Sequence, residues 1–258
     1  MKIFRSESFV DYKTYTFNYA TYCIKEDPSE LPEIYALGFL PYSNDVSLKE
    51  ETYYLARSLR VDLSVFKESS ENRRVARKIE ALQPSFEVVP IDEFDVNDPE
   101  FKAYCLDFAN KRFSEPLSKE RLDYIMQTES ISHVFQFKIA QKTVGYVISI
   151  MKQGSLHYWF AFFDLDLQAY SLGKWMMFSV IQWAFEQKLD YVYLGTCYGE
   201  KSLYKVRDFK GLCYFDGNQW DYDMKTLKQK CKSDQTFGVD AFKQDTDLFL
   251  ERLPKKTS

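Results

Sequence analysis

Residues 158–211 have the sequence YWFAFFDLDLQAYSLGKWMMFSVIQWAFEQKLDYVYLGTCYGEKSLYKVRDFKG. The stretch starts as an apolar strand, turns at Gln168, Ser171 and Gly173, and continues as a long apolar helix. A short second strand then ends at Gly195, before a segment rich in Lys, Tyr and Arg. A turn of this kind leaves backbone N–H groups free at the positive end of the helix. The stretch therefore predicts a site for a phosphate-bearing co-substrate at the edge of a sheet.

The rest of the chain alternates strand and helix patterns around this stretch. We expect strands within 1–26 and over 53–66, 86–91, 133–140, 143–152, 156–163, 191–194 and 212–215, and helices over 31–37, 71–78, 99–113, 119–127, 172–188 and 201–209. This order predicts an α+β or α/β fold with a mixed central sheet, and a ligand where the sheet breaks.

The pattern resets near Gln83-Pro84-Ser85, which suggests a domain boundary close to residue 86. We therefore expect a smaller α+β N-terminal domain over 1–86 and a larger domain over 87–222. Residues 223–258 are polar and charged with few strong patterns, so we expect a peripheral C-terminal extension.

The charge distribution sets limits on partners. A net charge of −4 argues against a protein that coats nucleic acid over its whole surface. Residues 57–78 nevertheless hold seven basic and three acidic side chains, against the overall sign. In this stretch Arg57, Arg60, Arg73 and Arg74 are candidates for RNA phosphates, while a solvated helix face is the alternative. Arg60 also fits a structural ion pair.

The cysteines and histidines argue against a metal site. Five scattered cysteines form no CxxC pair, which suggests free thiols in a reducing compartment, and only two histidines are present. For Cys197 the expected role is a small buried side chain. No signal peptide is visible, and the longest apolar run is too short to span a bilayer. We expect a cytoplasmic protein with no metal, no tightly bound cofactor and no membrane partner.

The turn Gln168-Ala169-Tyr170-Ser171-Leu172-Gly173 resembles the phosphate-binding turn of the GNAT acyltransferase superfamily. That turn has the form Gln/Arg-x-x-Gly-x-Gly/Ala and leads into a helix, and Ser171 stands where its first glycine is usual. The resemblance implies a GNAT-like acyltransferase domain. It also implies a co-substrate site that we assign to Gln168, Ser171, Leu172, Gly173 and Lys174.

A closer resemblance is to the arginyl-tRNA–protein transferase family, including its bacterial leucyl relatives. It covers roughly residues 30–82 and 156–212. It rests on Ser171-Leu172-Gly173, Tyr191-Val192-Tyr193-Leu194-Gly195, Lys201-Ser202-Leu203-Tyr204-Lys205, Tyr35 to Phe39, and the run Arg57-Ser58-Leu59-Arg60-Val61 with Phe66, Ser69, Arg73-Arg74 and Lys78. The chain departs from the family in lacking its N-terminal cysteine cluster and a clear Cys-Pro-Lys-Met element.

The resemblance implies transfer of an amino acid, Arg or Leu, from aminoacyl-tRNA to the α-amine of a protein or peptide N-terminus. The ester is already activated, so the chemistry needs no dedicated nucleophile. Tyr204 and Lys205 are the candidate catalytic residues, with Tyr204 as a proton donor. An ordinary packed tyrosine is the alternative for Tyr204. Lys201, Lys205, Arg207 and Lys210 form a second basic segment, for which a solvated helix face is the alternative.

Two other functions remain open at this point. The same turn suits a GNAT enzyme that uses acetyl-CoA or another acyl-CoA. A non-catalytic binding protein on the same fold is also possible, because Ser171 replaces the turn glycine and the cysteine cluster is lost. The sequence leaves the oligomeric state undetermined.

Overall fold

The computed structural model describes residues 1–11, 16–113, 116–206 and 209–234. Its strands form a four-stranded sheet in the order β1-β2-β4-β3 and an eight-stranded sheet in the order β12-β11-β5-β10-β9-β8-β7-β6. Of the described pairings only β9 with β10 is parallel. The strands are β1 (Lys2–Asp11), β2 (Thr16–Ile24), β3 (Phe39–Pro41), β4 (Thr52–Leu55), β5 (Ser58–Asp62), β6 (Pro84–Pro90), β7 (His133–Ile139), β8 (Lys142–Lys152), β9 (Ser155–Phe163), β10 (Tyr191–Thr196), β11 (Leu212–Phe215) and β12 (Trp220–Asp221).

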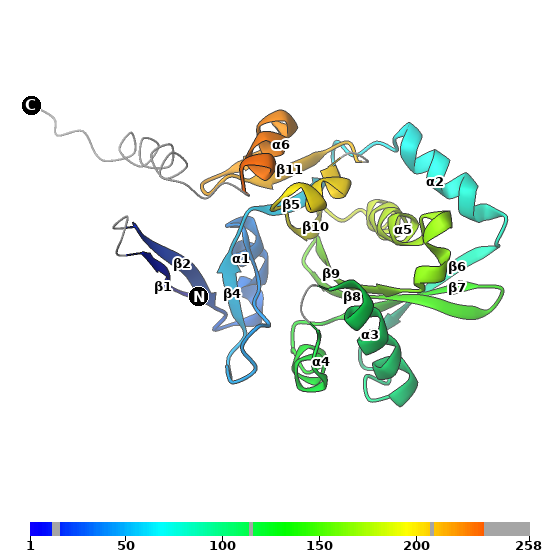
Figure 1. The fold of residues 1–258 in the computed structure, drawn as a ribbon, viewed down its shortest axis with the longest axis horizontal. Helices are drawn as coiled ribbons and strands as arrows, with labels where there is room; N and C mark the ends of the chain where they lie inside the picture. Colours follow the sequence, from blue (N-terminus) through cyan, green and yellow to red (C-terminus); the bar gives the residue numbers. More distant parts are fainter. Residues whose placement is uncertain (12–15, 114–115, 207–208, 235–258) are drawn as a thin grey trace, which may run out of the picture.

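Helices cover both faces of the larger sheet (Figure 1). Helices α2 and α5 lie on one face, α3 and α4 lie on the other, α1 packs on the smaller sheet, and α6 packs on β11. The α-helices are α1 (Leu31–Ala36), α2 (Ser70–Glu80), α3 (Pro99–Arg112), α4 (Lys119–Met126), α5 (Leu172–Glu186) and α6 (Met224–Ser233); the 3-10 segments are η1 (Pro28–Glu30), η2 (Leu165–Tyr170) and η3 (Glu200–Val206). The α+β prediction with a mixed sheet is confirmed.

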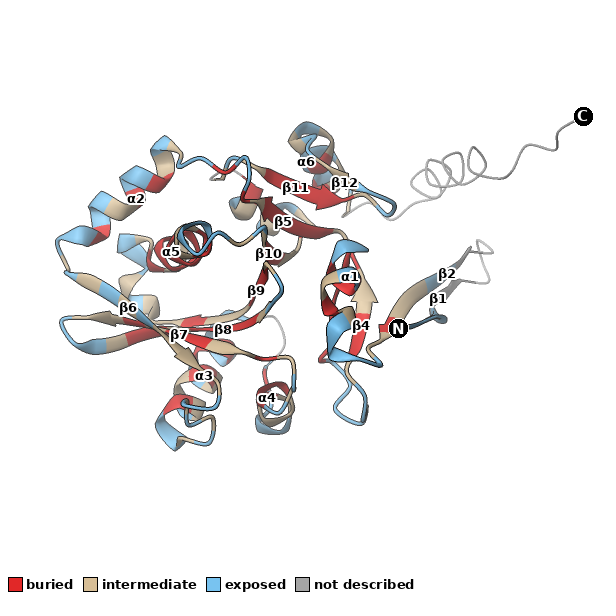
Figure 2. Ribbon diagram, turned by 180° about the vertical axis from the view of Figure 1, so that it is seen from behind, coloured by how far each residue is buried: buried red, intermediate tan, exposed pale blue. Residues whose placement is uncertain are grey.

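The apolar side chains of β10 point to opposite faces of the sheet, as the two-residue repeat of a strand requires. Val192 and Leu194 enter the core under α5, whereas Tyr193 enters the core on the α1 and α3 side. Helix α5 is buried on most sides because it is enclosed by the sheet and by α2, which explains why its sequence is apolar almost all round (Figure 2).

The extended stretch predicted over 53–66 forms two strands in the structure, β4 and β5. The chain breaks after Leu55, so that β4 ends in the smaller sheet and β5 enters the larger sheet between β11 and β10. Residues 1–86 are therefore divided between the two sheets, and the expected boundary near residue 86 does not coincide with that division. An alternating apolar pattern fits either strand, so it cannot reveal a change of sheet.

Helix α6 corrects the expectation that residues 223–258 are peripheral throughout. Leu227 and Cys231 are fully buried in the core of the larger sheet. The exposed face of α6 is rich in lysine, which gives the segment the composition of a peripheral extension. Residues 235–258 of the expected extension lie outside the described residues.

A polar network joins the smaller sheet to the loop between α4 and β7. Glu51 accepts hydrogen bonds from the Ser130 backbone N–H at 2.8 Å and from the Tyr53 hydroxyl at 3.0 Å. Lys25 forms an ion pair with Glu51 and donates to the Ser130 hydroxyl at 2.7 Å. Burial by itself raises the pKa of Glu51, but the hydrogen bonds from Lys25 and Ser130 outweigh burial and leave this pKa below its ordinary value.

We expect Glu51→Gln to lower the free energy of unfolding at pH 7 by roughly 2 to 3 kcal/mol, because Lys25 loses its charged partner. A lowered folded-state pKa stabilises the fold above the unfolded pKa of about 4.3, and that stabilisation is lost as the pH falls through the folded value. The deficit of the variant should therefore shrink on acidification. Urea unfolding at pH 7 and at pH 4 measures the loss of stability. Glu129→Gln, at an exposed position, is the control. If both variants lose the same free energy of unfolding, or if the loss in Glu51→Gln does not depend on pH, then the Glu51 carboxylate does not stabilise the fold in this way.

Candidate functional site

The larger sheet opens between its two parallel strands. Strand β9 pairs with β10 only from Ser155 to His157, although β9 continues to Phe163. A bulge in β9 at Trp159, where the register against β8 shifts, bends the strand at the point where the pairing stops. This opening is the break in the sheet at which the sequence places a ligand.

The polar turn follows the open end of β9 and starts α5. Ser171 has φ +62° and ψ 37°, the left-handed conformation in which glycine is the usual residue. The Ser171 carbonyl accepts from the N–H groups of Lys174 and Trp175, both at 3.0 Å. Among the described residues no side chain caps the start of α5, so the N–H groups of Leu172 and Gly173 are available to an external acceptor. Gln168 is exposed, and its carbonyl accepts from Ser171 N–H at 2.9 Å.

We expect Ser171→Gly to preserve activity and to raise the free energy of unfolding by up to about 1 kcal/mol. A non-glycine residue in the left-handed region costs about 1 to 2 kcal/mol, which the larger backbone entropy of glycine in the unfolded chain offsets in part. The measurement is thermal unfolding together with an activity assay. A loss of activity in the glycine variant, with the fold intact, would show that the Ser171 hydroxyl itself contacts a substrate.

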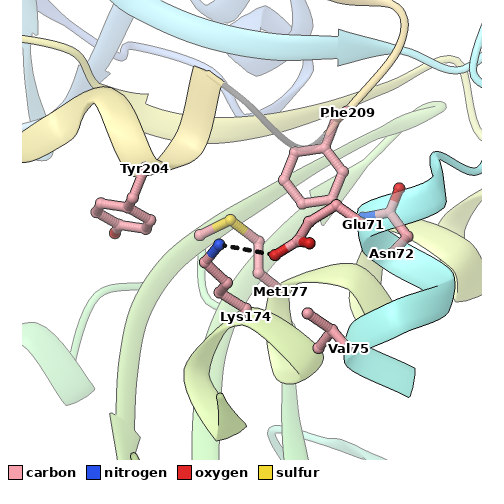
Figure 3. Close-up of a pocket in the computed structure, with 7 residues that line it drawn as sticks. All are labelled: Glu71, Asn72, Val75, Lys174, Met177, Tyr204 and Phe209. Carbon is pink, nitrogen blue, oxygen red and sulfur yellow. Dashed lines mark hydrogen bonds and ion pairs between the residues drawn. The ribbon is translucent and has the colours of Figure 1, made fainter. Parts of the chain in front are cut away.

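The first turn of α5 borders a small cavity (Figure 3). Lys174 points toward Glu71 of α2, with Nζ 3.3 Å from the carboxylate. Arg74 holds the same carboxylate through two hydrogen bonds of 2.6 and 2.8 Å and, with Lys174, lowers the pKa of Glu71 to about 2. The cavity is lined by Glu71, Asn72, Val75, Lys174, Met177, Tyr204 and Phe209. The structure thus brings Lys174 of the predicted anion site and Tyr204 of the predicted catalytic pair to one cavity.

Lys205 lies at the end of β10, beside the opening in the sheet. Its Nζ donates to the carbonyl oxygens of Leu194 at 2.9 Å and Thr196 at 3.2 Å. Burial lowers the pKa of Lys205 to about 8. Tyr204 is 42% exposed, and its ring centroid is 5.9 Å from the Lys205 Nζ. Both predicted catalytic residues come from η3, where the sequence pattern suggested a longer helix over 201–209.

His157 is a buried histidine in this region that the sequence did not single out. It is the last β9 residue paired with β10, and its Nδ1 is 3.0 Å from the Tyr35 hydroxyl of α1. Its Nε2 has no hydrogen-bond partner among the described residues. Burial, with a smaller effect of the nearby Lys205 charge, lowers the pKa of His157 to about 3, so the ring is neutral. No sequence signal marks this contact, because its two partners are 122 residues apart.

The four predicted RNA-binding arginines separate into two pairs. Arg73 and Arg74 lie exposed on α2, beside the cavity. Arg60 is buried in β5, with its guanidinium 3.8 Å from the Tyr191 ring centroid and 4.0 Å from that of Trp220. Arg57 forms a two-point ion pair with Asp234. Phosphate contacts by these residues stay a prediction, and Arg57 and Arg60 already contact other parts of the chain.

In the second basic segment Lys201 and Lys210 are exposed, and Arg207 lies outside the described residues. The described residues contain no group of three or more His, Cys, Asp or Glu side chains that could hold a metal ion. Among the described helices, none is long and apolar enough to cross a lipid bilayer. Cys197 is fully buried, 3.6 Å from the sulfur of Cys231.

Comparison with known proteins gives one curated relative and several partial structural likenesses. An aspartate/glutamate leucyltransferase from Saccharophagus degradans is 25% identical over 170 residues, which cover 63% of this chain and 69% of the relative.

Among solved structures, the C-terminal domain of a putative lysylphosphatidylglycerol synthetase from Agrobacterium fabrum is 16% identical with a TM-score of 0.41, over 68% of this chain and 54% of that chain. FemX is 9% identical with a TM-score of 0.42, over 69% of this chain and 63% of that chain. The chain thus spans less than two thirds of these two structures.

A family model described as an acetyltransferase (GNAT) domain matches residues 69–210. The matched region contains α2, the open pair β9 and β10, the turn at Ser171, α5 and η3. The predicted GNAT-like fold and the predicted acyltransferase class are thereby confirmed. Since the match covers more than half of the chain, this protein belongs to the GNAT acetyltransferase domain family.

Proposed function

We propose that this protein transfers an amino acid, leucine or arginine, from aminoacyl-tRNA to the α-amine of a protein or peptide N-terminus. The observation that carries the proposal is the position of α2 beside the start of α5. The exposed side chains of Arg77 and Lys78 extend the positive charge of that helix terminus along α2, next to Arg73 and Arg74, which form surface ion pairs with Glu68 and Glu71. A row of cations beyond the first phosphate site suits a polynucleotide end, because each neutralised phosphate adds to affinity.

The leucyltransferase relative supports the same reading. The name of that relative indicates aspartate and glutamate acceptors, so peptides that begin with Asp or Glu are the first acceptors to test. The proposed donor is leucyl- or arginyl-tRNA, which is a co-substrate and not a tightly bound cofactor.

The reaction breaks the ester between the amino-acid carbonyl carbon and the ribose oxygen of the tRNA and forms an amide with the acceptor nitrogen. The acceptor amine loses a proton, and the ribose oxygen gains one. In this proposal Tyr204 supplies the proton to the ribose oxygen. The Lys205 ammonium stabilises the negative charge that develops on the carbonyl oxygen. Positioning by the turn and by α2 contributes the rest of the acceleration, since the ester is already activated.

Transfer from an acyl-CoA is the second candidate. The left-handed turn at Ser171 and the uncapped start of α5 form a site for a single pyrophosphate, and the matched family is described as an acetyltransferase domain. A coenzyme A donor would use the turn and would not need the exposed cations farther along α2, Arg77 and Lys78.

The test is transfer of label to peptides that begin with Asp, Glu, Arg or Lys, from leucyl-tRNA, arginyl-tRNA or acetyl-CoA in parallel. We expect transfer from an aminoacyl-tRNA only, and inhibition by uncharged tRNA. Binding of tRNA should weaken steeply between 50 and 200 mM salt, by about 10-fold or more for a few phosphate contacts. Transfer from acetyl-CoA alone would select the second candidate, and no transfer from any donor would favour a binding protein.

A further inference from the structure

The segment Cys197–Val206, which we call the 197–206 segment, carries Tyr204 and Lys205 between β10 and β11. Helix α6 lies beside this segment, although it comes later in the chain (Figure 1). The polar contacts between them are concentrated at the end of α6.

Asp234, directly after α6, accepts three hydrogen bonds. Two come from the Arg57 guanidinium, at 2.8 Å from Nη1 and 3.1 Å from Nη2. The third comes from the Gly199 backbone N–H at 2.7 Å. One carboxylate therefore joins the link between β4 and β5 to the start of the 197–206 segment.

Arg57 completes this link from its own side. Its Nη1 also donates to the Cys197 carbonyl at 3.3 Å, and its guanidinium carbon lies 4.7 Å from the Tyr198 ring centroid. The Tyr198 hydroxyl accepts from the Arg57 backbone N–H at 2.8 Å. The planar guanidinium suits such a two-point ion pair, and lysine would keep only its charge.

Buried contacts of the Cys231 and Cys197 sulfur atoms also join α6 to the 197–206 segment. The Cys231 thiol donates to the Cys197 carbonyl at 3.5 Å. The Cys197 sulfur lies 3.2 Å from the Ser202 hydroxyl, and that hydroxyl donates to the Gly199 carbonyl at 2.8 Å. Burial raises the pKa of Cys197 to about 11, which fits a packing role and not a reactive thiolate.

We propose that Asp234 is a positioning residue for the transfer reaction: through Arg57 and Gly199 it fixes the 197–206 segment, so that Lys205 stays on the Leu194 and Thr196 carbonyls beside the opening in the sheet. This inference rests on the proposed function for its effect on rate. Its effect on Lys205 is independent of that function.

The first test is the transfer assay on the full chain with Asp234→Asn and Asp234→Ala. We expect kcat to fall about 10-fold in the first variant and more in the second, with KM for the acceptor peptide changed less than twofold. Glu87→Gln is the control, because Glu87 forms an exposed ion pair with Lys138 and lies on β6, the edge strand four places from β10 in the larger sheet. Rates equal to the control would overturn the proposal.

The second test reads Lys205 directly. Its titration is followed by pH-dependent labelling with limiting acetic anhydride and peptide mass spectrometry. Lys205 has a pKa of about 8 because it is buried, and in the described part of the chain the titratable groups facing it are Cys197, His157 and Tyr204. When the Asp234 contacts with Arg57 and Gly199 are lost, Lys205 becomes more exposed to solvent, and its apparent pKa should rise toward the ordinary value of about 10.4. An unchanged titration in a folded Asp234→Ala protein would overturn the proposal.

Arg57→Lys covers the case in which Asp234→Ala fails to fold. It keeps the charge but loses the two-point geometry, so we expect a smaller shift of the Lys205 titration in the same direction. If the wild-type protein transfers no amino acid, the proposed function is wrong. The titration of Lys205 would still show whether Asp234 fixes the 197–206 segment.

Discussion

Lys205→Met is expected to lower kcat by about 100-fold or more while the protein stays folded. Removal of one donor aimed at a developing oxyanion typically costs about 100- to 1,000-fold. Methionine keeps the apolar stem of the side chain, but it leaves the Leu194 and Thr196 carbonyls without their Lys205 donor. We therefore expect the free energy of unfolding to fall by about 1 to 3 kcal/mol, and kcat is measured well below the melting temperature of the variant. The measurement is steady-state transfer with the aminoacyl-tRNA saturating. Lys201→Met, in the same segment but exposed, is the matched control and should keep wild-type kcat.

The pH profile tests the charge state of this lysine. Lys205 has a lowered pKa of about 8, so it loses its proton as the pH rises through that value, and the rate should fall on the alkaline side. Lys205→Arg keeps the positive charge to above pH 12. We expect that variant to retain part of the activity and to lack the alkaline decline. An alkaline decline of equal midpoint in both proteins would assign it to another group.

The local structure around the candidate site, a strand, a turn and a helix, is what the sequence predicted well. The strand, the turn and α5 follow one another along the chain, so periodicity and the turn residues define them without knowledge of the fold. Ser171 is the clearest example: it stands at a position where related turns have glycine, and its φ is +62°. Lys174 is on α5, directly before β10 in the chain, and Tyr204 is on η3, directly after it. Because these elements follow one another, the two side chains reach the same cavity.

Contacts between distant parts of the chain were not predictable in this way. The local excess of positive charge predicts RNA contacts for Arg57, yet its carboxylate partner in the structure, Asp234, lies 177 residues away. Glu71 and Lys174 are 103 residues apart, and Tyr35 reaches His157 across 122. A single sequence holds no signal for such pairs, since each side chain in isolation has the pattern of a solvated or packed residue. A cluster of basic residues in the sequence is therefore a weaker guide to a nucleic-acid-binding surface than the order of strands and helices is to the fold.

Gly173→Ala is the second change with a large expected effect. A Cβ added at Gly173 would lie 2.7 Å from Cζ of Phe163, closer than packed carbon atoms allow. The start of α5 must then move away from β9, or the Phe163 ring must leave its place at the opening. Overpacking of this kind costs typically about 1 to 3 kcal/mol. Because the shift displaces the N–H groups of Leu172 and Gly173, we expect Kd for the donor to rise by about 10- to 100-fold, which corresponds to about 1.4 to 2.7 kcal/mol.

Two further variants separate the position of the N–H groups from general packing. Gly145→Ala brings its Cβ to 2.8 Å from the Met176 side chain, also on α5 but one turn beyond its start. It should destabilise the fold and leave donor affinity close to that of the wild type. In Gly173→Ala/Phe163→Leu the ring atoms that clash are gone, so donor affinity should recover in a titration of the folded protein with the donor. If affinity stays low in the double variant, the loss lies in the backbone of the turn and not in the contact between α5 and Phe163.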